Sequence, residues 1–495
     1  MEYLVIAGYL LALASIFIFS LGQLHLTYLY LKKKQRSDRS LPVQPDEWPA
    51  VTVQLPVYNE KYVVERLIDC VASFDYPLNK LEIQVLDDST DETTELIRKR
   101  VAFWQQKGID IHLVRRPDRK GYKAGALQYG LEKAKGEFIA IFDADFLPRK
   151  DFLKKTVPYF RNEETGVVQT RWGHINEDFS LFTRLQAFGL NAHFSIEQGG
   201  RSQAGSFINF NGTAGVWRKA CITDAGGWSD DTLTEDLDLS YRAQFKGWHF
   251  QYLEDVISPA ELPVLMSSIK SQQFRWNKGA AETARKNIGK LWRSDLSVTN
   301  KLHAYFHLFN SSVFLGVLVA ALLSIPMLFI KATNPALHVV FDLGTVFLIG
   351  FFAIAFFYWV SVKNTLTAPH GQKAVSSASY YIKYFPLFLS VSMGLSLHNA
   401  LAVLEGLLGI RTPFIRTPKF NVSNDKGSLK QNKYIKQRIT IATLTEGVMA
   451  LYFLFGIVSG FYLQDYGLLL FHLMLFGGFI TVFYQSVRRV KYAAG

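Results

Sequence analysis

Two aspartates separated by one residue, Asp143 and Asp145, directly follow a short apolar run that reads IAIF. In an extended backbone, residues i and i+2 point the same way, so both carboxylates can reach one cation, or one cation and a ribose. Oxygen ligands suit Mg²⁺ or Mn²⁺, and the motif has no His or Cys to favour zinc. Such an ion would offset the negative charge that develops on a departing diphosphate. The two aspartates are therefore candidate metal ligands.

The acidic sequence Thr234-Glu235-Asp236 is a second candidate for chemistry. A carboxylate here could act as a general base that takes the proton from an acceptor hydroxyl, which typically contributes about 10²–10⁴-fold to the rate. We expect Asp236 to be this base, with Glu235 beside it as a second catalytic carboxylate. The alternative is an acidic helix start, where Asp and Glu interact favourably with the helix dipole.

Gln272, Arg275 and Trp276 fall within roughly one turn of a predicted helix. Trp offers a flat apolar face for a sugar ring, and Arg and Gln offer hydrogen-bond donors for a diphosphate. The alternative is an interfacial aromatic side chain beside an Arg that reaches from the membrane edge toward water.

These side chains need a scaffold, and residues 50–290 alternate β-rich runs with amphipathic helical patterns. This alternation is typical of an α/β fold with a mostly parallel sheet, in which ligands bind outside the carboxyl ends of the strands. We expect strands at 51–58, 81–88, 109–116 and 136–145. Their ends would bring together six polar residues: Asn59, Glu60, Asp87, Asp88, Asp143 and Asp145. Alternatively, some of these aspartates cap helices, as the DSTD sequence at 88–91 could do.

Residues 3–31 carry no Asp, Glu, Lys or Arg and exceed the roughly 20 apolar residues that a membrane-spanning helix needs. The run is too long for the apolar part of a signal peptide. Because Lys32, Lys33, Lys34 and Arg36 follow it, the positive-inside rule places the chain after residue 32 in the cytoplasm. With this run, the chain has about six apolar segments, the others lying at about 304–331, 339–361, 378–408, 441–462 and 466–487.

The basic segment 409–438 conflicts with a simple count of these spans. Its charge predicts the cytoplasmic side, whereas six full spans would place it outside. One run is therefore not a full span. We expect it to be 378–408, whose second half carries His398, Asn399 and Glu405 and could lie along the interface as an amphipathic helix.

The formal net charge of +12 suggests either nucleic acid or the cytoplasmic face of a membrane as a partner. We favour the membrane because no nucleic-acid-binding signature accompanies the charge. Cys70 and Cys221 are the only cysteines, and their spacing suggests neither a disulfide framework nor a zinc site. A P-loop enzyme and a Rossmann dehydrogenase are disfavoured, since the sequence has no GxxxxGK[ST] and no GxGxxG after a strand.

The order of the motifs resembles the D,D,D,QxxRW pattern of family 2 inverting glycosyltransferases. The matching motifs are LPVYNE at 55–60, DDS at 87–89, DAD at 143–145, TED at 234–236 and QQFRW at 272–276, followed by membrane helices. The pattern is similar to that of cellulose synthase-like enzymes, including the plant glucomannan and xyloglucan-backbone synthases. The resemblance implies a GT-A domain at about 40–295, between an N-terminal transmembrane helix at 1–36 and a helical membrane region at 300–495.

The resemblance also implies roles for individual residues. Asp87 and Asp88 would bind the base and ribose with Asn59 and Glu60 beside them, and Asp143 and Asp145 would bind nucleotide and metal. Asp236 would be the base, and Gln272, Arg275 and Trp276 would hold the diphosphate and the acceptor end. Lys123 in KGYKAGAL at 120–127 matches a stretch near the donor, and Asn211, Gly212 and Thr213, with Arg218, match a stretch that lines the acceptor's terminal sugar.

The sequence RTPKFNVSNDKG at 416–427 resembles the gating loop that closes over the donor in cellulose synthases. Thr417, Lys419 and Phe420 would then stack on or bond to a bound nucleotide. A basic loop that serves only membrane topology is the alternative.

The expected activity is metal-dependent, inverting transfer from a UDP- or GDP-sugar to a glycan or lipid acceptor, on the cytoplasmic side of a membrane. We favour a processive β-glycan synthase of the cellulose or mannan type. The rival enzyme adds one sugar to a lipid, as the ceramide glucosyltransferases do. A non-catalytic polysaccharide-binding or transport subunit is disfavoured, because every carboxylate expected to act is present.

Overall fold

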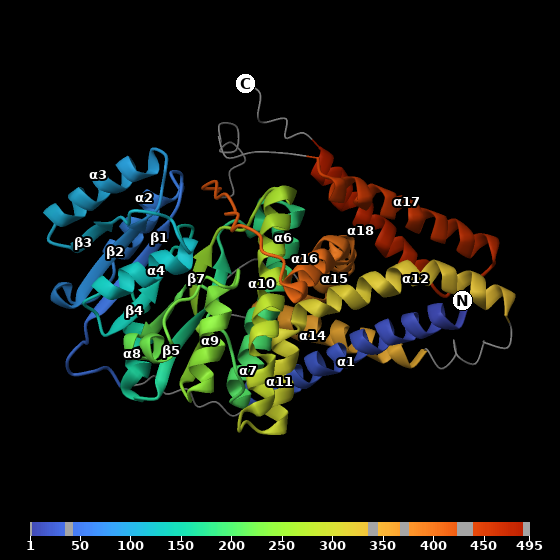
Figure 1. Ribbon diagram of the computed structural model, residues 1–495, viewed down its shortest axis with the longest axis horizontal. Coiled ribbons are helices and arrows are strands. Elements are labelled where there is room, and N and C mark those ends of the chain that lie inside the picture. Colours follow the sequence, from blue (N-terminus) through green and yellow to red (C-terminus); the bar gives the residue numbers. More distant parts are fainter. Residues whose placement is uncertain (1, 35–42, 335–344, 367–375, 423–438, 489–495) are drawn as a thin grey trace.

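The structure, a computed structural model, describes residues 2–34, 43–334, 345–366, 376–422 and 439–488. Seven strands form one sheet in the order β3-β2-β1-β4-β6-β5-β7 (Figure 1). All neighbouring strands are parallel except β6, which is antiparallel to both β4 and β5. The strands are β1 (Val51–Val57), β2 (Leu81–Asp87), β3 (Asp110–Val114), β4 (Phe138–Ile141), β5 (Thr165–His174), β6 (Gly215–Arg218) and β7 (His249–Ala260).

The four strands expected from the sequence correspond to β1 to β4, and β5 to β7 extend the sheet beyond them. β1 lies between β2 and β4, with Val57 opposite Asp87 and Gln54 opposite Ile141. This parallel register brings the carboxyl ends of the three strands to one edge of the sheet. The polar side chains that follow them therefore meet there.

Helices cover both faces of the sheet, and the side chains of β4 alternate between the two resulting cores. Phe138 and Ala140 pack with α2 (Val64–Ala72), α3 (Thr93–Gln106) and α5 (Phe152–Thr156). Ile139 and Ile141 pack instead with three helices on the other face: α4 (Tyr122–Lys133), α8 (Lys219–Asp224) and α9 (Glu235–Phe245).

A second group of helices lies between the sheet and the apolar helices at the other end of the molecule (Figure 1). It contains α6 (Leu181–Ala192), a π-helical turn (His193–Gln198), α7 (Gly199–Ala204), α10 (Met266–Arg293) and α11 (Val298–Leu308). The long helix α10 packs against α9, α11 and α16 (Ser396–Leu408). It therefore joins the α/β region to α16 and the apolar end of the molecule.

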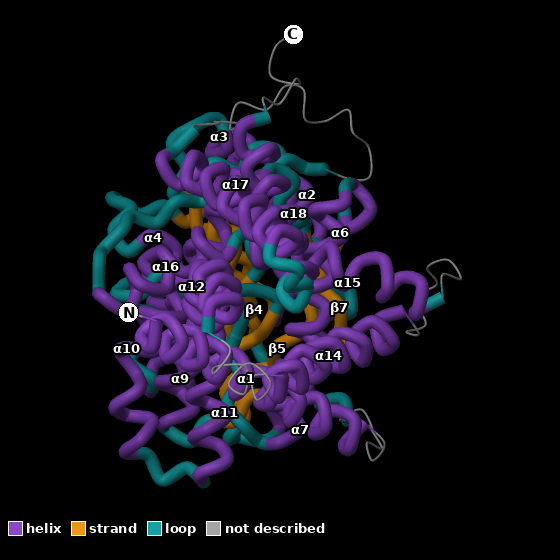
Figure 2. The backbone as a smooth tube through the Cα atoms, turned by 90° about the vertical axis from the view of Figure 1, so that its right-hand side faces the viewer, coloured by secondary structure: helices purple, strands orange, loops and turns teal. Residues whose placement is uncertain are grey.

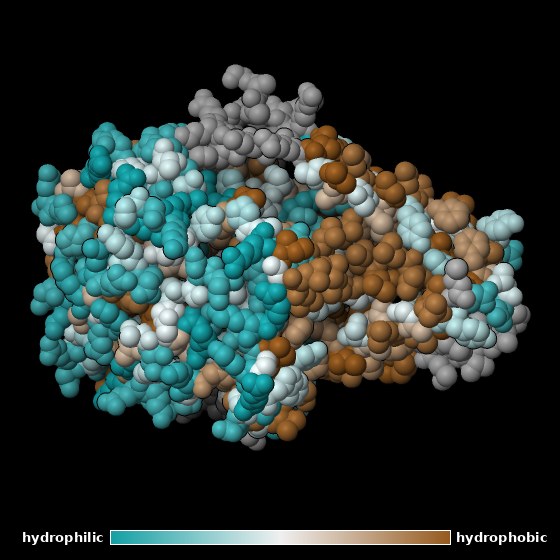
Figure 3. Space-filling view, viewed as in Figure 1, coloured by the Kyte–Doolittle hydropathy of each residue, from teal (hydrophilic) through white to brown (hydrophobic). Residues whose placement is uncertain are grey.

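Five helical segments in the described parts of the chain are long and apolar enough to cross a membrane. They are Glu2–Lys32 in α1 (Glu2–Lys34), Asn310–Thr333 with α12 (Val313–Thr333), Thr345–Leu366 with α14 (Leu348–Leu366), α17 (Ile441–Tyr462) and α18 (Leu469–Val487). Figure 2 shows these helices in front of the sheet when the molecule is viewed from their end. Their outer surface is apolar, whereas the α/β end is hydrophilic (Figure 3).

The run 378–408 is broken, as expected: α15 (Ser377–Gly394) and α16 meet at a bend of 51°. Asn399 and His398 of α16 bond to α10, through the Gln273 side chain at 2.8 Å and the Lys270 carbonyl at 2.9 Å. Leu401, Leu404 and Leu408 of α16 are exposed. α16 therefore has a polar side that contacts α10 and an exposed apolar side, as an amphipathic helix does.

The expected span 304–331 is wrong at its start. Residues up to 308 belong to α11, where Ala304 and Leu308 are buried with Tyr241 of α9, and the apolar span begins at Asn310. Apolarity alone did not separate a buried helix from a membrane helix here. Parts of three expectations lie outside the described residues: Arg36 of the basic stop, the first residues of the run 339–361, and residues 423–438 of the basic loop.

Candidate functional site

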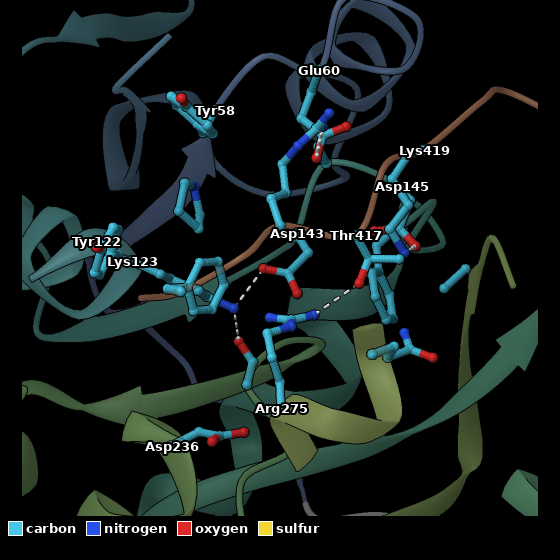
Figure 4. A pocket seen from close by; sticks show the side chains of 18 of the residues that line it. Tyr58, Glu60, Tyr122, Lys123, Asp143, Asp145, Asp236, Arg275, Thr417 and Lys419 are labelled. Carbon is cyan, nitrogen blue, oxygen red and sulfur yellow. Dashed lines mark hydrogen bonds and ion pairs between the residues drawn. The ribbon is translucent and has the colours of Figure 1, made fainter. Parts of the chain in front are cut away.

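A pocket lies at the carboxyl ends of β1, β2 and β4, and α10 forms one of its walls (Figure 4). The carboxyl end of β5 and residues that follow β7 complete the lining, together with the segment after α16. The pocket brings together most of the side chains predicted to act. They are Glu60, Asp88, Lys123, Asp143, Asp145, Gly212, Glu235, Asp236, Gln272, Arg275 and Trp276.

Three other predicted residues, Asn59, Asp87 and Thr213, do not line the pocket but support it. Asn59 adopts a left-handed conformation with φ 54°, and its side chain accepts a hydrogen bond from Thr90 N at 2.9 Å. Asp87 accepts bonds from Ser89 N at 2.9 Å and the Thr94 hydroxyl at 2.7 Å. These bonds fix the turns after β1 and β2.

Asp143 faces the pocket beside the ammonium of Lys123, at 2.5 Å. Lys123 also donates to the carbonyl of Gly212 at 2.9 Å, and the backbone N–H of Asp143 donates to the Thr213 hydroxyl at 2.9 Å. Burial lowers the pKa of Lys123, but the neighbouring carboxylates outweigh it and raise the pKa overall. Lys123 is therefore a cation held next to the first aspartate of the DAD motif.

Residues 410–422, which follow α16 and which we name the covering segment, lie across the same pocket (Figure 4). Lys419 pairs with Asp145 at 2.7 Å, and Arg416 pairs with Glu60 at 2.7 Å. Burial raises the pKa of Glu60 to about 7 despite this guanidinium. The covering segment thus supplies cations to two carboxylates that would otherwise be buried alone.

The aromatic contact in this segment comes from a residue other than the expected one. Phe420 is 2% exposed and packs with Val422, away from the pocket lining, while its backbone N–H donates to Glu261 at 2.8 Å. Phe414 lies in the pocket instead, stacked with Tyr122 at 5.7 Å and 4.6 Å from the Arg275 guanidinium. Thr417 accepts a bond from Arg275 at 3.2 Å.

The carboxylates of the DAD motif fit a metal ion that is shared with a ligand. Among the residues that the structure describes, no three His, Cys, Asp or Glu side chains form a complete metal site. Mg²⁺ and Mn²⁺ are commonly held by one or two carboxylates, with substrate phosphates supplying further oxygens. Asp143 and Asp145 would suit this arrangement, and in the structure Asp145 is paired with the ammonium of Lys419.

Asp236 lies in the first turn of α9, where its Oδ1 accepts the backbone N–H of Leu237 at 2.9 Å. Burial, with the nearby charge of Glu235, raises the pKa of Asp236. Gly212, with φ 77°, brings its backbone against this carboxylate, since a Cβ there would lie 3.0 Å from Asp236 Oδ2. A buried carboxylate with a raised pKa beside an open pocket is a suitable general base.

Gln272, Arg275 and Trp276 project from one face of α10, as their i, i+3 and i+4 spacing requires. Arg275 points toward the middle of the pocket (Figure 4). The centre of the Trp276 ring lies 6.4 Å from that of Trp172, a residue of β5. The helix therefore presents a cation and an aromatic face to the same space.

At the other end of the pocket, Arg119 stacks on Tyr58 at 3.4 Å and lies 4.9 Å from the Tyr122 ring. Arg116 holds Asp88 through two bonds of 2.8 and 2.5 Å. Several lining residues were not predicted from the sequence: Tyr58, Arg119, Tyr122, Trp172, His174, Glu261 and Phe414. Glu261 and His174 lie at or just after the ends of β7 and β5, so recognising those strands would have found them.

Two glycosyl transferase families match parts of this chain. Residues 52–223 match the model for glycosyl transferase family 2, and residues 138–362 match that for glycosyl transferase family group 2. A probable glucomannan 4-beta-mannosyltransferase 4 of Oryza sativa subsp. japonica is 45% identical over 268 residues, which are 53% of this chain and 49% of the relative. Glucomannan 4-beta-mannosyltransferase 7 of Arabidopsis thaliana is 42% identical over 268 residues, 53% of this chain and 48% of the relative. The chain spans about half the length of these curated relatives.

A solved mannosyltransferase from Pyrobaculum calidifontis, in complex with GDP-Man and Mn²⁺, shares the fold. It aligns with a TM-score of 0.54 and 19% identity over 82% of this chain and 100% of its own. This likeness confirms the expected α/β fold of the GT-A type.

The pairing of Lys419 with Asp145 generates a prediction about metal affinity. Lys419→Met removes the ammonium and keeps a side chain of similar length. We expect this variant, without any donor, to bind Mn²⁺ about tenfold or more tightly, because two like unit charges about 4 Å apart repel by about 4 kcal/mol at an effective dielectric constant of about 20. Electron paramagnetic resonance of free Mn²⁺ measures the affinity.

Lys154→Met is the matched control, because Lys154 pairs with Asp75 at the surface, away from the pocket. Its Mn²⁺ affinity should equal that of the wild type. An unchanged affinity in Lys419→Met would contradict the idea that the ammonium and the ion compete.

Proposed function

We propose that the protein transfers a sugar, with inversion, from a nucleotide-diphosphate donor to a growing β-linked glycan at a membrane, because residues 52–223 and 138–362 match glycosyl transferase family 2 and family group 2. The observation that carries this proposal is that one pocket unites Asp143, Asp236, Arg275 and Trp276. Asp143 would hold the metal that binds the diphosphate, and Asp236 would act as the base. Arg275 would neutralise the diphosphate, and Trp276 would offer a flat face to the sugar. The pocket adjoins apolar helices, which supports product formation at a membrane.

The relatives' names support mannose as the transferred sugar. Those relatives are named glucomannan 4-beta-mannosyltransferases, and the solved mannosyltransferase binds GDP-Man. We therefore propose GDP-mannose as the first donor to test, with UDP-sugars as the alternative. The basic residues Lys32, Lys33 and Lys34 at the end of α1 support a cytoplasmic position for the catalytic region.

In the proposed reaction the acceptor hydroxyl attacks the anomeric carbon from the face opposite the diphosphate. The proton of that hydroxyl passes to Asp236, while the bond from the anomeric carbon to the diphosphate breaks and its electron pair stays on the diphosphate oxygen. Lys123 and Arg275 stabilise the charge that develops there, in a buried site where electrostatic interactions are strong. A divalent cation held by Asp143 and Asp145 would add further neutralisation of the diphosphate.

A cavity of about 990 Å³ lies between the apolar helices and supports a polymer as the product. α1 packs against α12 and α14, α14 against α15, α15 against α18, α18 against α17, and α17 against α12, so these helices form a ring. Trp276 lines both this cavity and the catalytic pocket. A glycan that grows at Asp236 would therefore pass Trp276 and enter the ring of helices.

The lining of the same cavity favours one second candidate, transfer of a single sugar to a lipid. Most of its lining is apolar, with side chains such as Leu13, Phe17, Phe314, Phe351 and Phe388. A hydrocarbon chain would bury its surface there without needing hydrogen bonds. Aromatic rings also stack on sugar rings, so the lining alone does not decide against a glycan.

Product size distinguishes the two candidates. We would incubate the nanodisc-embedded protein with radiolabelled GDP-mannose, GDP-glucose and UDP-sugars in the presence of Mn²⁺. We expect GDP-mannose to give a high-molecular-weight product that β-mannanase digests. Label confined to one or two sugars in the lipid extract would establish the lipid acceptor, and no transfer from any donor would refute the glycosyltransferase proposal.

The role of Asp236 predicts a specific loss in Asp236→Asn. The amide keeps the shape of the carboxylate but does not accept the acceptor's proton, so transfer should fall at least about a hundredfold. Donor and Mn²⁺ binding, measured by calorimetry, should be retained. Asp224→Asn, at an exposed position outside the pocket, should keep normal turnover. Near-normal transfer by Asp236→Asn would remove this residue from the role of base.

The charge of Glu235 predicts the pH profile. Because Asp236 must be deprotonated to act, activity should fall as the pH drops below its raised pKa. Glu235→Gln removes a neighbouring negative charge, which lowers the pKa of Asp236. The acidic limb of kcat/KM should therefore move to lower pH, whereas Glu164→Gln, at an exposed position, should leave it in place. An acidic limb that stays put or moves to higher pH in Glu235→Gln would contradict this coupling.

A further inference from the structure

The catalytic pocket and the cavity among the apolar helices meet at a small group of polar and aromatic residues. Trp276 lines both spaces, Asn211 lines the pocket, and His193 and Glu197 line the cavity. Asn211 and His193 join the two sides, since Asn211 Nδ2 lies 3.2 Å from His193 Nε2. If the product grows as proposed above, the acceptor passes this junction.

The backbone at the junction is unusual. His193–Gln198 forms a π-helical turn between α6 and α7. Single π-helical turns are rare and often occur at functional sites. Five of its six residues are buried, and the partly exposed His193 lies with its Nδ1 2.7 Å from Glu197 Oε2.

The hydrogen bonds define which ring nitrogen of His193 carries the proton. Glu197 is an acceptor, so Nδ1–H donates to it, and Nε2 is left as the acceptor for the Asn211 amide. The orientation of that amide is consistent, because Asn211 Oδ1 accepts a 2.7 Å bond from Gln198 Nε2. Every donor in this series of hydrogen bonds therefore meets an acceptor.

Glu197 is itself fixed from two sides. Gln23 of α1 donates to its Oε1 at 2.8 Å, and Arg201 lies 3.9 Å from its Oε2. Burial would raise the pKa of Glu197, but the bond from His193 and the charge of Arg201 lower it overall. Glu197 is thus an anion that holds the imidazole in one tautomer and connects it to the N-terminal helix.

At its other end, this series of hydrogen bonds lies close to Lys123 and Asp236. Asn211 is followed directly by Gly212, whose carbonyl binds Lys123 and whose backbone lies against Asp236. A change in the place of Asn211 would therefore move the loop beside the base. None of these contacts touches the side of the pocket where Asp88 and Arg119 lie.

We propose that His193, held by Glu197, is a positioning residue that fixes Asn211 and thereby aligns the acceptor's terminal sugar hydroxyl with Asp236. This inference rests on the proposed glycosyl transfer and adds a residue pair to it. It predicts that weakening the His193–Asn211 bond impairs use of the acceptor while leaving donor binding intact.

Two substitutions of His193 distinguish the roles of its two ring nitrogens. His193→Gln places an amide group close to the position of Nε2 and keeps a partner for Asn211. His193→Asn places its amide near Nδ1, toward Glu197, and is too short to reach Asn211. One lost hydrogen bond contributes about 0.5–1.5 kcal/mol, so we expect the acceptor KM of His193→Asn to rise about two- to tenfold and that of His193→Gln to stay near the wild-type value.

The assay uses the full-length protein in nanodiscs with labelled GDP-mannose and a β-manno-oligosaccharide acceptor. The donor KM and nucleotide release without acceptor should be equal in wild type and both variants. A purely structural role would instead give equal losses in both variants, or a loss of donor binding, and either result would overturn the inference. Normal acceptor use by His193→Asn would overturn it as well.

A second variant tests the route through Asn211. Asn211→Ala removes the other partner of the same bond, and the additional substitution His193→Asn should then have no further effect on the acceptor KM. Independent, additive losses would overturn the inference. If His193→Asn does not accumulate, Asn211→Ala alone should reproduce the acceptor-specific loss, and a loss confined to donor use would contradict it. Wild-type protein that transfers no sugar would refute the proposed function itself, a result distinct from transfer that is insensitive to His193.

Discussion

The site depends on one electrostatic constraint: several carboxylates are buried at the same edge of the sheet and must be neutralised there. Glu60, Asp145, Glu235 and Glu261 are each less than 10% exposed, and Asp143 and Asp236 lie among them. A buried carboxylate without a cation or a proton is very unfavourable. The cations therefore have to come from elements that are distant in sequence, and this requirement determines how the rest of the chain is arranged around the sheet.

Three different elements meet this requirement. Lys123 comes from α4, which packs on the sheet, Arg275 comes from α10, and Arg416 and Lys419 come from the covering segment. α10 in turn is held by α16 through Lys278 and Glu405 at 2.9 Å and by α17 through Lys270 and Glu446 at 2.5 Å. The ion pairs of the pocket and those of the membrane side thus connect the α/β region to the apolar helices as one system.

Much of the site was predictable because its parts follow local rules. Parallel strands that end in polar residues place those residues at one edge, and a carboxylate pair with i, i+2 spacing reaches the same point. The i, i+3, i+4 spacing likewise placed Gln272, Arg275 and Trp276 on one face of α10. The four strands that carried these motifs were correct, and so was the break within 378–408.

What the sequence did not reveal depends on contacts between distant segments. β6 has four residues and runs antiparallel, so neither its length nor its neighbours mark it as part of the sheet. Asp87 and Asn59 occupy motif positions, yet tertiary contacts turn them into turn supports. Phe414 enters the pocket in place of Phe420 because Phe420 finds a buried site against Val422 and Val264, a choice that only the packed structure defines.

Two segments that lie far apart in the sequence complete different sides of this site. The covering segment, which follows α16, reaches the carboxylates that suit a metal and donor, whereas Gln23 of α1 reaches the acceptor side through Glu197. Both contributions come from outside the α/β region, which on its own would lack Arg416 beside Glu60 and Gln23 beside Glu197. A carboxylate that gains water instead of a fixed cation loses its position and its perturbed pKa together. The apolar helices and the segment after α16 therefore belong to the electrostatic environment of the pocket.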